Sequence, residues 1–232
     1  MNEVPAPVIT TAAPLSPERV AYWYLRLNGF LQIENFVVHP PHHGGQRTDA
    51  DIIGVRFPHR AERLIDDPDD LMQDDLDRLR LSPDRIDIVI SEIKTGRCAL
   101  NGPWTDEERQ NIHRVIAAIG SVPTKIVEAA ASALYKDAEF DEAEHPRVRL
   151  VLFGRERDGE IAEKYSGITQ VEWADALAFI WKRFDKYRRQ KTQVDQWDNA
   201  GQRLKALANR HDESEFVVEA CKLMGVQAAK AA

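Results

Sequence analysis

The stretch that decides the fold is Ile86-Asp87-Ile88-Val89-Ile90-Ser91-Glu92-Ile93-Lys94-Thr95-Gly96. Its first half is an almost unbroken run of β-branched apolar residues, which is typical of a strand buried on both faces. Side chains alternate along a strand, so Glu92 and Lys94 point to the same side where the apolar run ends. The pattern predicts a strand over residues 85–94 with a carboxylate and an amine at its carboxyl end.

A second apolar strand, predicted over residues 49–57, contains another carboxylate, Asp51, with Asp49 on the same side as a fallback. Magnesium takes oxygen ligands and needs only one or two protein carboxylates besides water. Asp51 and Glu92 on adjacent strands, together with the carbonyl of Ile93, can therefore hold a divalent cation. Lys94 can then orient an attacking water.

The remaining elements follow from caps and periodicity. Ser16-Pro17-Glu18 predicts a helix start, and Asn28-Gly29 its end. Thr105 and Glu108 have the spacing of a capping box, which predicts a helix start there. Further strands are expected over residues 30–38, 148–153 and 168–171. Further helices are expected over residues 66–81, with Leu71, Met72, Leu76 and Leu79 inward, and over residues 124–134, 173–187 and 194–224.

Strands separated by helices indicate an α/β fold with a central mixed sheet flanked by helices. We expect a disordered leader over residues 1–15, an α/β domain over residues 16–191 and a C-terminal helical appendage over residues 192–232. No glycine-rich phosphate loop follows a strand, so a nucleotide-binding motif of that type is not supported.

Composition narrows the class of protein. No apolar run approaches the roughly 20 residues of a membrane helix, no secretory signal is visible, and the two cysteines imply no disulfide framework. We expect a cytoplasmic protein with no membrane partner.

The charged residues behind the net charge of −7 are unevenly distributed along the chain. Aspartates are concentrated in residues 66–77, and cations are concentrated in residues 181–191. The acidic segment favours a charged surface helix. The basic stretch is either a solvated helix face or a nucleic-acid contact.

The segments around Thr48-Asp49-Ala50-Asp51 and Ile90-Ser91-Glu92-Ile93-Lys94 resemble the PD-(D/E)xK nuclease superfamily, which includes restriction endonucleases and Holliday-junction resolvases. The resemblance covers roughly residues 16–171. It implies a restriction endonuclease-like core in which Asp51 and Glu92 bind metal and Lys94 is catalytic. Glu18, early in the first helix, would assist through water. A polar residue on the helix after the Lys94 strand would complete the site, with Gln110, Asn111 and Arg114 as candidates. The proline that usually precedes the first acid is replaced by Ala50.

The resulting hypothesis is a Mg²⁺-dependent endonuclease acting on DNA, in which Mn²⁺ can substitute. A homodimer or protein partner is expected through the C-terminal helices. Three alternatives stay open: a catalytically inactive nuclease fold that serves as an interaction module in a defence or repair complex, an RNA-directed nuclease, and a merely salt-bridged strand end. A zinc site at His39, His42 and His43 is a weaker possibility.

Overall fold

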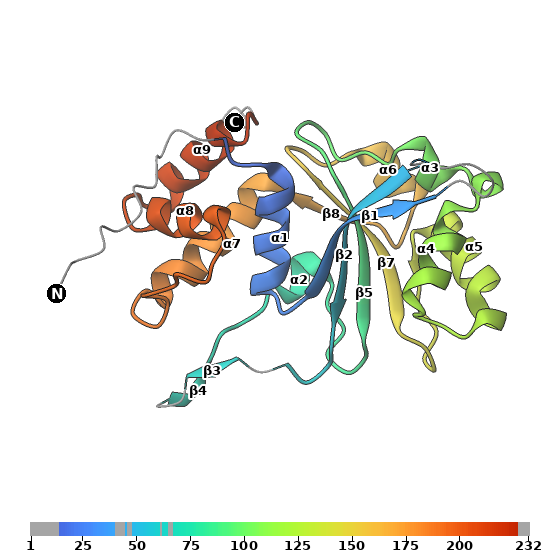
Figure 1. The fold of residues 1–232 in the computed structure, drawn as a ribbon, viewed down its shortest axis with the longest axis horizontal. Coiled ribbons are helices and arrows are strands. Elements are labelled where there is room, and N and C mark those ends of the chain that lie inside the picture. Colours follow the sequence, from blue (N-terminus) through green and yellow to red (C-terminus); the bar gives the residue numbers. More distant parts are fainter. Residues whose placement is uncertain (1–13, 40–44, 46–47, 61, 65–66, 227–232) are drawn as a thin grey trace.

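A six-stranded mixed sheet forms the centre of the molecule, with strand order β1-β2-β5-β7-β6 and with β8 paired to β7 (Figure 1). This computed structural model describes residues 14–39, 45, 48–60, 62–64 and 67–226, and only the backbone of residues 63, 64 and 67–70. The strands of the sheet are β1 (Leu31–Val38), β2 (Thr48–Arg56), β5 (Asp87–Ile93), β6 (Glu139–Phe140), β7 (Arg147–Gly154) and β8 (Thr169–Glu172).

Strand β2 is antiparallel to both β1 and β5, whereas β7 is parallel to both β5 and β8 and antiparallel to β6. Every residue of β5 is buried, as its apolar run predicts. The α/β class, with a mixed sheet and helices on its faces, is confirmed.

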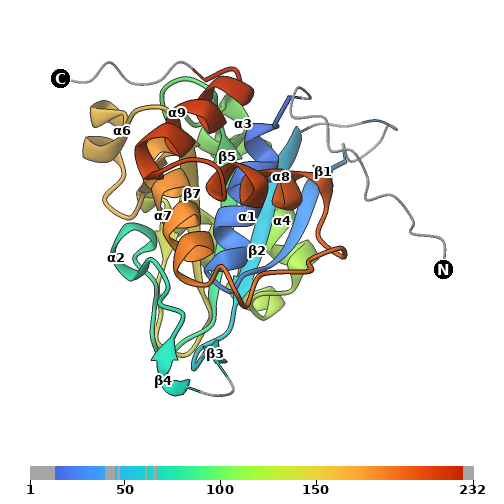
Figure 2. The ribbon, with the colours of Figure 1, turned by 90° about the vertical axis from the view of Figure 1, so that its left-hand side faces the viewer.

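Two helical layers cover the sheet (Figures 1 and 2). One hydrophobic cluster joins the sheet to α1 (Pro17–Leu27), α7 (Trp173–Lys186), α8 (Asn199–Ala208) and α9 (Glu213–Leu223). The second cluster joins the other face to α3 (Gly102–Thr105), α4 (Asn111–Ile119) and α5 (Val127–Asp137). The helix α6 (Gly159–Lys164) and the 3₁₀ turns Glu107–Arg109 and Thr124–Ile126 lie in the connections. The C-terminal helices therefore share one core with α1 and α7.

The predicted ends of the first helix are confirmed. The Ser16 hydroxyl accepts from the Arg19 amide at 3.3 Å, and Pro17 begins the helix. Gly29 follows the helix with a φ of +83°, a backbone conformation that glycine adopts without strain. In the part of the chain that the structure describes, no helix has the length and apolar composition needed to cross a membrane.

The helix predicted over residues 66–81 is wrong. The chain instead forms a hairpin of β3 (Arg63–Leu64) and β4 (Asp67–Leu71), followed by the short helix α2 (Leu76–Leu79). Pro68 disfavours the helical conformation of the residue before it, and aspartates are poor helix formers. Met72 and Leu79 are buried as expected, but Leu76 is exposed.

The helix start predicted from the capping box at Thr105 is also wrong, although the helix expected to carry Ile112, Val115, Ile116 and Ile119 is present as α4. Asp106 is extended, and α4 begins at Asn111, after Gln110 with a φ of +55°. Two expectations fall outside the described residues: most of the N-terminal leader, and His42 and His43 of the suggested zinc set.

A buried ion pair fastens β5 to β7. The Arg149 guanidinium donates to both Asp87 carboxylate oxygens at 2.9 and 2.8 Å, and both side chains are fully buried. Its third nitrogen donates to the Leu79 carbonyl at 2.7 Å and to the Thr169 hydroxyl at 3.0 Å. One side chain thus satisfies its donors while joining β5, β7, α2 and β8.

We expect Arg149→Met to lower the free energy of unfolding by about 3–5 kcal/mol, because it leaves the Asp87 carboxylate buried and unpaired. Chemical denaturation measures the loss. Arg85→Met is the matched control, since the Arg85–Asp141 pair is partly exposed and exposed pairs contribute about 0–1 kcal/mol. Equal losses in the two variants would contradict the role given to the buried pair.

Candidate functional site

The register between β2 and β5 brings together the acidic residues expected from the sequence. Ile52 pairs with Ser91, so the next step along the two antiparallel strands sets Asp51 across from Glu92. Side chains at directly opposed positions stand about 4.5–5.5 Å apart at Cβ. Lys94 follows the end of β5, and its amine forms an ion pair with Glu92 Oε1. The structure therefore places Asp51, Glu92 and Lys94 side by side at one end of β5.

The ladder between β2 and β5 opens at this point. The last pair of the ladder is Ile52 with Ser91, and Oδ2 of the Asp51 carboxylate then accepts from the Ile93 amide at 2.7 Å. The N–H and C=O of one residue in an extended strand leave it on the same side. The Ile93 carbonyl consequently faces the side where Asp51 lies, as its candidate role as a ligand requires.

Glu92 is held by three donors. The Trp104 indole donates to Oε2 at 2.8 Å, and the Asn101 amide and the Lys94 amine both donate to Oε1. Glu92 and Trp104 are 5% and 2% exposed. The sequence did not identify Asn101 and Trp104 as partners of Glu92. The available signal was that a buried indole N–H needs a hydrogen-bond acceptor.

The loop after β5 is fixed to β7 by backbone hydrogen bonds. The Lys94 amide donates to the Phe153 carbonyl at 2.9 Å, and the Cys98 amide donates to the Glu156 carbonyl at 2.9 Å. The Trp173 indole donates to the Lys94 carbonyl at 2.9 Å. A Cβ at Gly154 would come within 2.6 Å of the Cys98 backbone nitrogen, so only glycine fits there. The backbone of Lys94 is thus held on both sides.

The Asp51 carboxyl has a pKa raised to about 6. Burial is the main cause, and the nearby Glu92 charge adds to it, whereas the Ile93 amide and the Lys94 amine act in the opposite direction. A carboxyl group that resists ionisation beside a second carboxylate is typical of functional sites. A bound cation would favour the ionised form of this group.

The other residues suggested for the site lie elsewhere. Glu18 begins α1, which packs on the opposite face of the sheet from Glu92, and its carboxylate accepts from the Ser16 hydroxyl. Among the described residues no hydrogen bond or ion pair joins Glu18 to Asp51, Glu92 or Lys94.

The candidates on the helix after β5 do not contact the site either. Asn111 is buried and donates to the Pro103 carbonyl at 2.9 Å, below α3. Gln110 is exposed, and Arg114 is half-buried. Asp49 lies two residues from Asp51 on β2 and acts on it through its charge alone.

The donor set fits a cation that keeps most of its water. Within the described ranges no group of three or more His, Cys, Asp or Glu side chains could hold a metal. Magnesium nevertheless binds through one or two carboxylates, which Asp51 and Glu92 would supply with the Ile93 carbonyl. Oδ1 of Asp51 has no hydrogen-bond partner in the described structure. Glu92 is less available than Asp51 as a ligand, because a cation that binds Oε1 would displace the Lys94 amine or the Asn101 amide.

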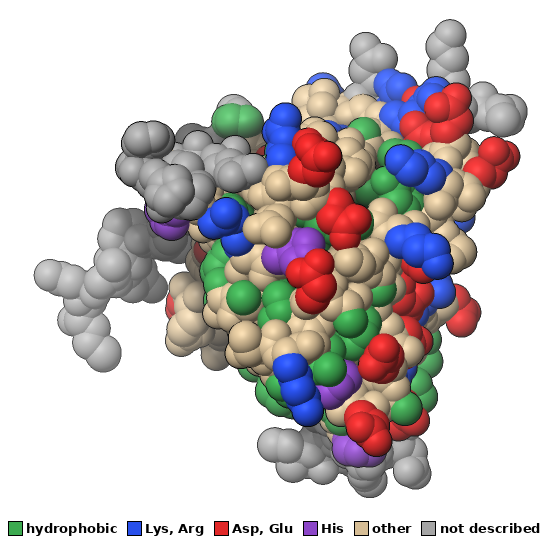
Figure 3. Space-filling view, turned by 90° about the vertical axis from the view of Figure 1, so that its right-hand side faces the viewer, with side chains coloured by type: hydrophobic (Ala, Val, Ile, Leu, Met, Phe, Trp, Pro, Cys, Tyr) green, Lys and Arg blue, Asp and Glu red, His purple; other side chains and the backbone are tan. Residues whose placement is uncertain are grey.

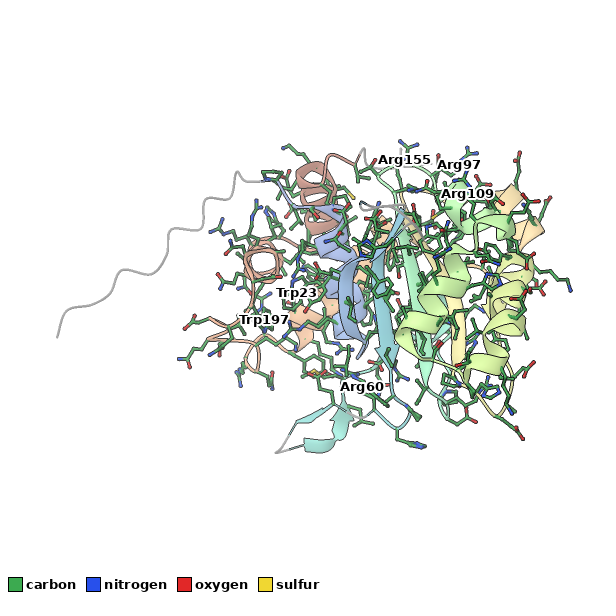
Figure 4. The ribbon with its side chains drawn as sticks, turned by 45° about the vertical axis from the view of Figure 1, so that its right-hand side comes forward. Trp23, Arg60, Arg97, Arg109, Arg155 and Trp197 are labelled. Carbon is green, nitrogen blue, oxygen red and sulfur yellow. The ribbon has the colours of Figure 1, made fainter. Side chains whose placement is uncertain are left out.

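Exposed guanidinium groups lie beyond Lys94 at this end of the sheet. Figure 4 shows Arg97, Arg109 and Arg155 at this end of the sheet, and Arg97 and Arg155 share Glu156 as an ion-pair partner. The Arg97 side chain is 60% exposed and pairs with Glu156 at 3.6 Å. Exposed ion pairs of this kind are weak, so the guanidinium can exchange its partner for a phosphate.

No protein-family model, curated protein or solved structure matches this chain. The resemblance to PD-(D/E)xK nucleases therefore rests on its own residues and their geometry.

The raised pKa of Asp51 predicts a pH dependence of stability in the metal-free protein. The folded pKa of about 6 exceeds the unfolded value of about 3.9, so the folded state binds more protons between these values. Wild type should lose about 1–2 kcal/mol of unfolding free energy, relative to Asp51→Asn, as pH rises from about 4 to about 7. Urea unfolding in EDTA measures this difference. Parallel stability curves for the two proteins would refute it.

Proposed function

We propose that this protein is a cytoplasmic, metal-dependent endonuclease that hydrolyses phosphodiester bonds in DNA. The observation that carries the proposal is the placement of Asp51, Glu92 and Lys94 at one end of two paired strands. Two carboxylates and a lysine amine are the groups that metal-assisted hydrolysis requires. A core of this class, with the acidic strand antiparallel to the Glu-x-Lys strand, also accords with the PD-(D/E)xK resemblance.

Each residue would have a distinct role. Asp51 and Glu92 would hold Mg²⁺ or Mn²⁺ together with the Ile93 carbonyl. When bound, the cation supplies charge neutralisation at the phosphoryl oxygens and lowers the pKa of its water. Lys94, whose side chain is 27% exposed, can reach a substrate at the rim and stabilise negative charge there.

The space-filling view bears on where a nucleic acid could approach. On the face that carries α4 and α5, basic and acidic side chains are interspersed (Figure 3). No broad surface of one sign covers that face in the described residues. A phosphate backbone would instead be met locally, by cations such as Arg97 and Arg155 at this end of the sheet (Figure 4).

A specific observation favours the inactive module as a second candidate. Both carboxylate oxygens of Glu92 already accept hydrogen bonds, and one of the donors is Lys94. In an interaction module this arrangement would serve to anchor α3 and the loop after β5 to the sheet. The two candidates differ in whether a cation can displace these donors.

We expect Lys94→Ala to reduce DNA cleavage by about 100-fold or more, because it removes a group that stabilises charge in the transition state. Cleavage is measured with Mg²⁺ and with Mn²⁺ on linear, nicked and branched DNA, and on RNA. Lys136→Ala is the matched control, since Lys136 lies on α5 and its side chain is 82% exposed. Equal cleavage by wild type and Lys94→Ala would exclude the mechanism.

We also expect Asp51→Asn to abolish Mn²⁺ binding in calorimetry while the protein stays folded. The asparagine carbonyl can still accept from the Ile93 amide, so the substitution removes charge and leaves this hydrogen bond in place. Asp77→Asn, at an exposed position of α2, should bind as wild type does. A wild type that binds no Mn²⁺ would favour the interaction module.

A further inference from the structure

A second concentration of charge lies at the other end of the sheet from Lys94, where the hairpin β3–β4 returns to the body of the protein. Figure 4 shows Arg60 there, at the base of the hairpin and far from Arg97 and Arg155. Cations from β2, the loop after it, α7, the segment that follows α7 and α8 gather at this place. We call them the basal cluster: Arg56, Arg60, Arg183, Lys191 and Lys205.

Two carboxylates face this cluster. Asp74 accepts from Arg56 at 2.8 Å and from Arg60 at 2.5 Å, and it lies 3.7 Å from Arg183. Glu62 accepts from Arg60 at 2.5 Å and lies 3.5 Å from Arg183 and 3.8 Å from Lys191.

The neighbouring acids have other partners. Asp75 accepts from the Tyr24 hydroxyl and pairs with Arg78, and Asp185 pairs with Arg188. Among the described side chains, five cations therefore share two carboxylates.

Three donors in the cluster have no hydrogen-bond partner in the described structure. Nη1 of Arg183 is buried and makes no hydrogen bond, although it lies 3.5 Å from Glu62 Oε2, in a side chain that is only 2% exposed. No described group accepts from the amine of Lys191 or of Lys205, and both residues are 8% exposed. The nearest carboxylate to the Lys191 amine is Glu62, beyond hydrogen-bonding distance. Of the three donors, Nη1 of Arg183 is itself a buried atom, and a buried donor without an acceptor is unfavourable.

The electrostatics of the two lysines agree with this geometry. Burial lowers the pKa of Lys191, and the charges of Arg183, Lys205 and Arg60 lower it further against the opposing effect of Glu62. Burial and the charge of Arg188 lower the pKa of Lys205. Among the described side chains, positive charge therefore outweighs negative charge around both amines.

We propose that the basal cluster binds a phosphate-class oxyanion whose oxygens accept from Arg183 Nη1 and from the amines of Lys191 and Lys205. A tetrahedral oxyanion offers several acceptor oxygens, and guanidinium and ammonium groups are its usual protein partners. The anion is either a free phosphate group or a phosphate of a nucleic-acid backbone. The site does not depend on the metal chemistry at Asp51, because it lies at the opposite end of β2.

The first test is binding of inorganic phosphate to the full chain by calorimetry, with chloride at the same ionic strength as the reference. Lys191→Gln and Lys205→Gln should each weaken phosphate binding about ten-fold or more, since each removes a charge-assisted hydrogen bond. Both variants should melt in chloride at the wild-type temperature or above it, because each relieves repulsion between cations.

Lys182→Gln is the matched control, since Lys182 lies on α7 but is 65% exposed and pairs with Glu213. It should bind phosphate as wild type does. The control also corrects for the general stabilisation that phosphate salts give to folded proteins.

A second measurement separates the two sources of the anion. Binding of a labelled single-stranded oligonucleotide is followed by anisotropy in EDTA, where metal-dependent cleavage cannot occur. Weaker oligonucleotide binding by Lys191→Gln would assign the site to a nucleic-acid backbone, and unchanged oligonucleotide binding with lost phosphate binding would assign it to a free anion. Absence of phosphate binding to wild type, or wild-type binding by both variants, would overturn the proposal.

Discussion

The ion pair between Arg149 and Asp87 holds together β5 and β7, the two central strands of the sheet. It joins β5 to β7 with two hydrogen bonds at zero exposure, and it ties α2 and β8 to the same point. Because β5 is buried along its whole length, it has little freedom to slide or rotate between its neighbours. The carboxyl end of the strand, where Glu92 and Lys94 lie, is fixed as a consequence.

The candidate site exists because the ladder between β2 and β5 stops one residue before Asp51 would pair. A regular ladder would give the Ile93 amide a backbone acceptor, whereas here the Asp51 carboxylate takes that place. At the same opening, Oδ1 of Asp51 has no hydrogen-bond partner among the described residues. Both oxygens of Glu92 already accept hydrogen bonds, Oε1 from Lys94 and Asn101 and Oε2 from Trp104, so a cation that binds Glu92 must displace at least one of these donors.

Much of the fold could be predicted from the sequence, because the central strands are long apolar runs and the first helix has clear caps. The acidic segment could not, since a local charge pattern does not distinguish a surface helix from a hairpin. The opposition of Asp51 and Glu92 depends on register, which strand patterns suggest but do not fix. Glu18 was expected at the site but lies elsewhere, because the sequence does not show which face of the sheet a helix will cover.

Arg149 and the basal cluster show a further limit of the sequence. An arginine within the apolar run of β7 signals a buried ion pair, but its partner Asp87 is distant in the chain. The basic stretch over residues 181–191 allowed a solvated face or a nucleic-acid contact, yet Arg183 and Lys191 are buried beside Glu62. Contacts between remote segments decide which charges are buried, and only the three-dimensional structure supplies them.

The central claim is that the space between Asp51 and Glu92 receives a divalent cation. A crystal soaked in Mn²⁺ and measured near the manganese absorption edge tests it most directly, because anomalous scattering locates the ion without reference to activity. The account predicts one anomalous peak within bonding distance of Asp51 Oδ1, Glu92 Oε1 and the Ile93 carbonyl, with the Lys94 amine moved off Glu92. A fully soaked crystal with no peak there, and with Glu92 still bonded to Lys94, Asn101 and Trp104, would contradict it.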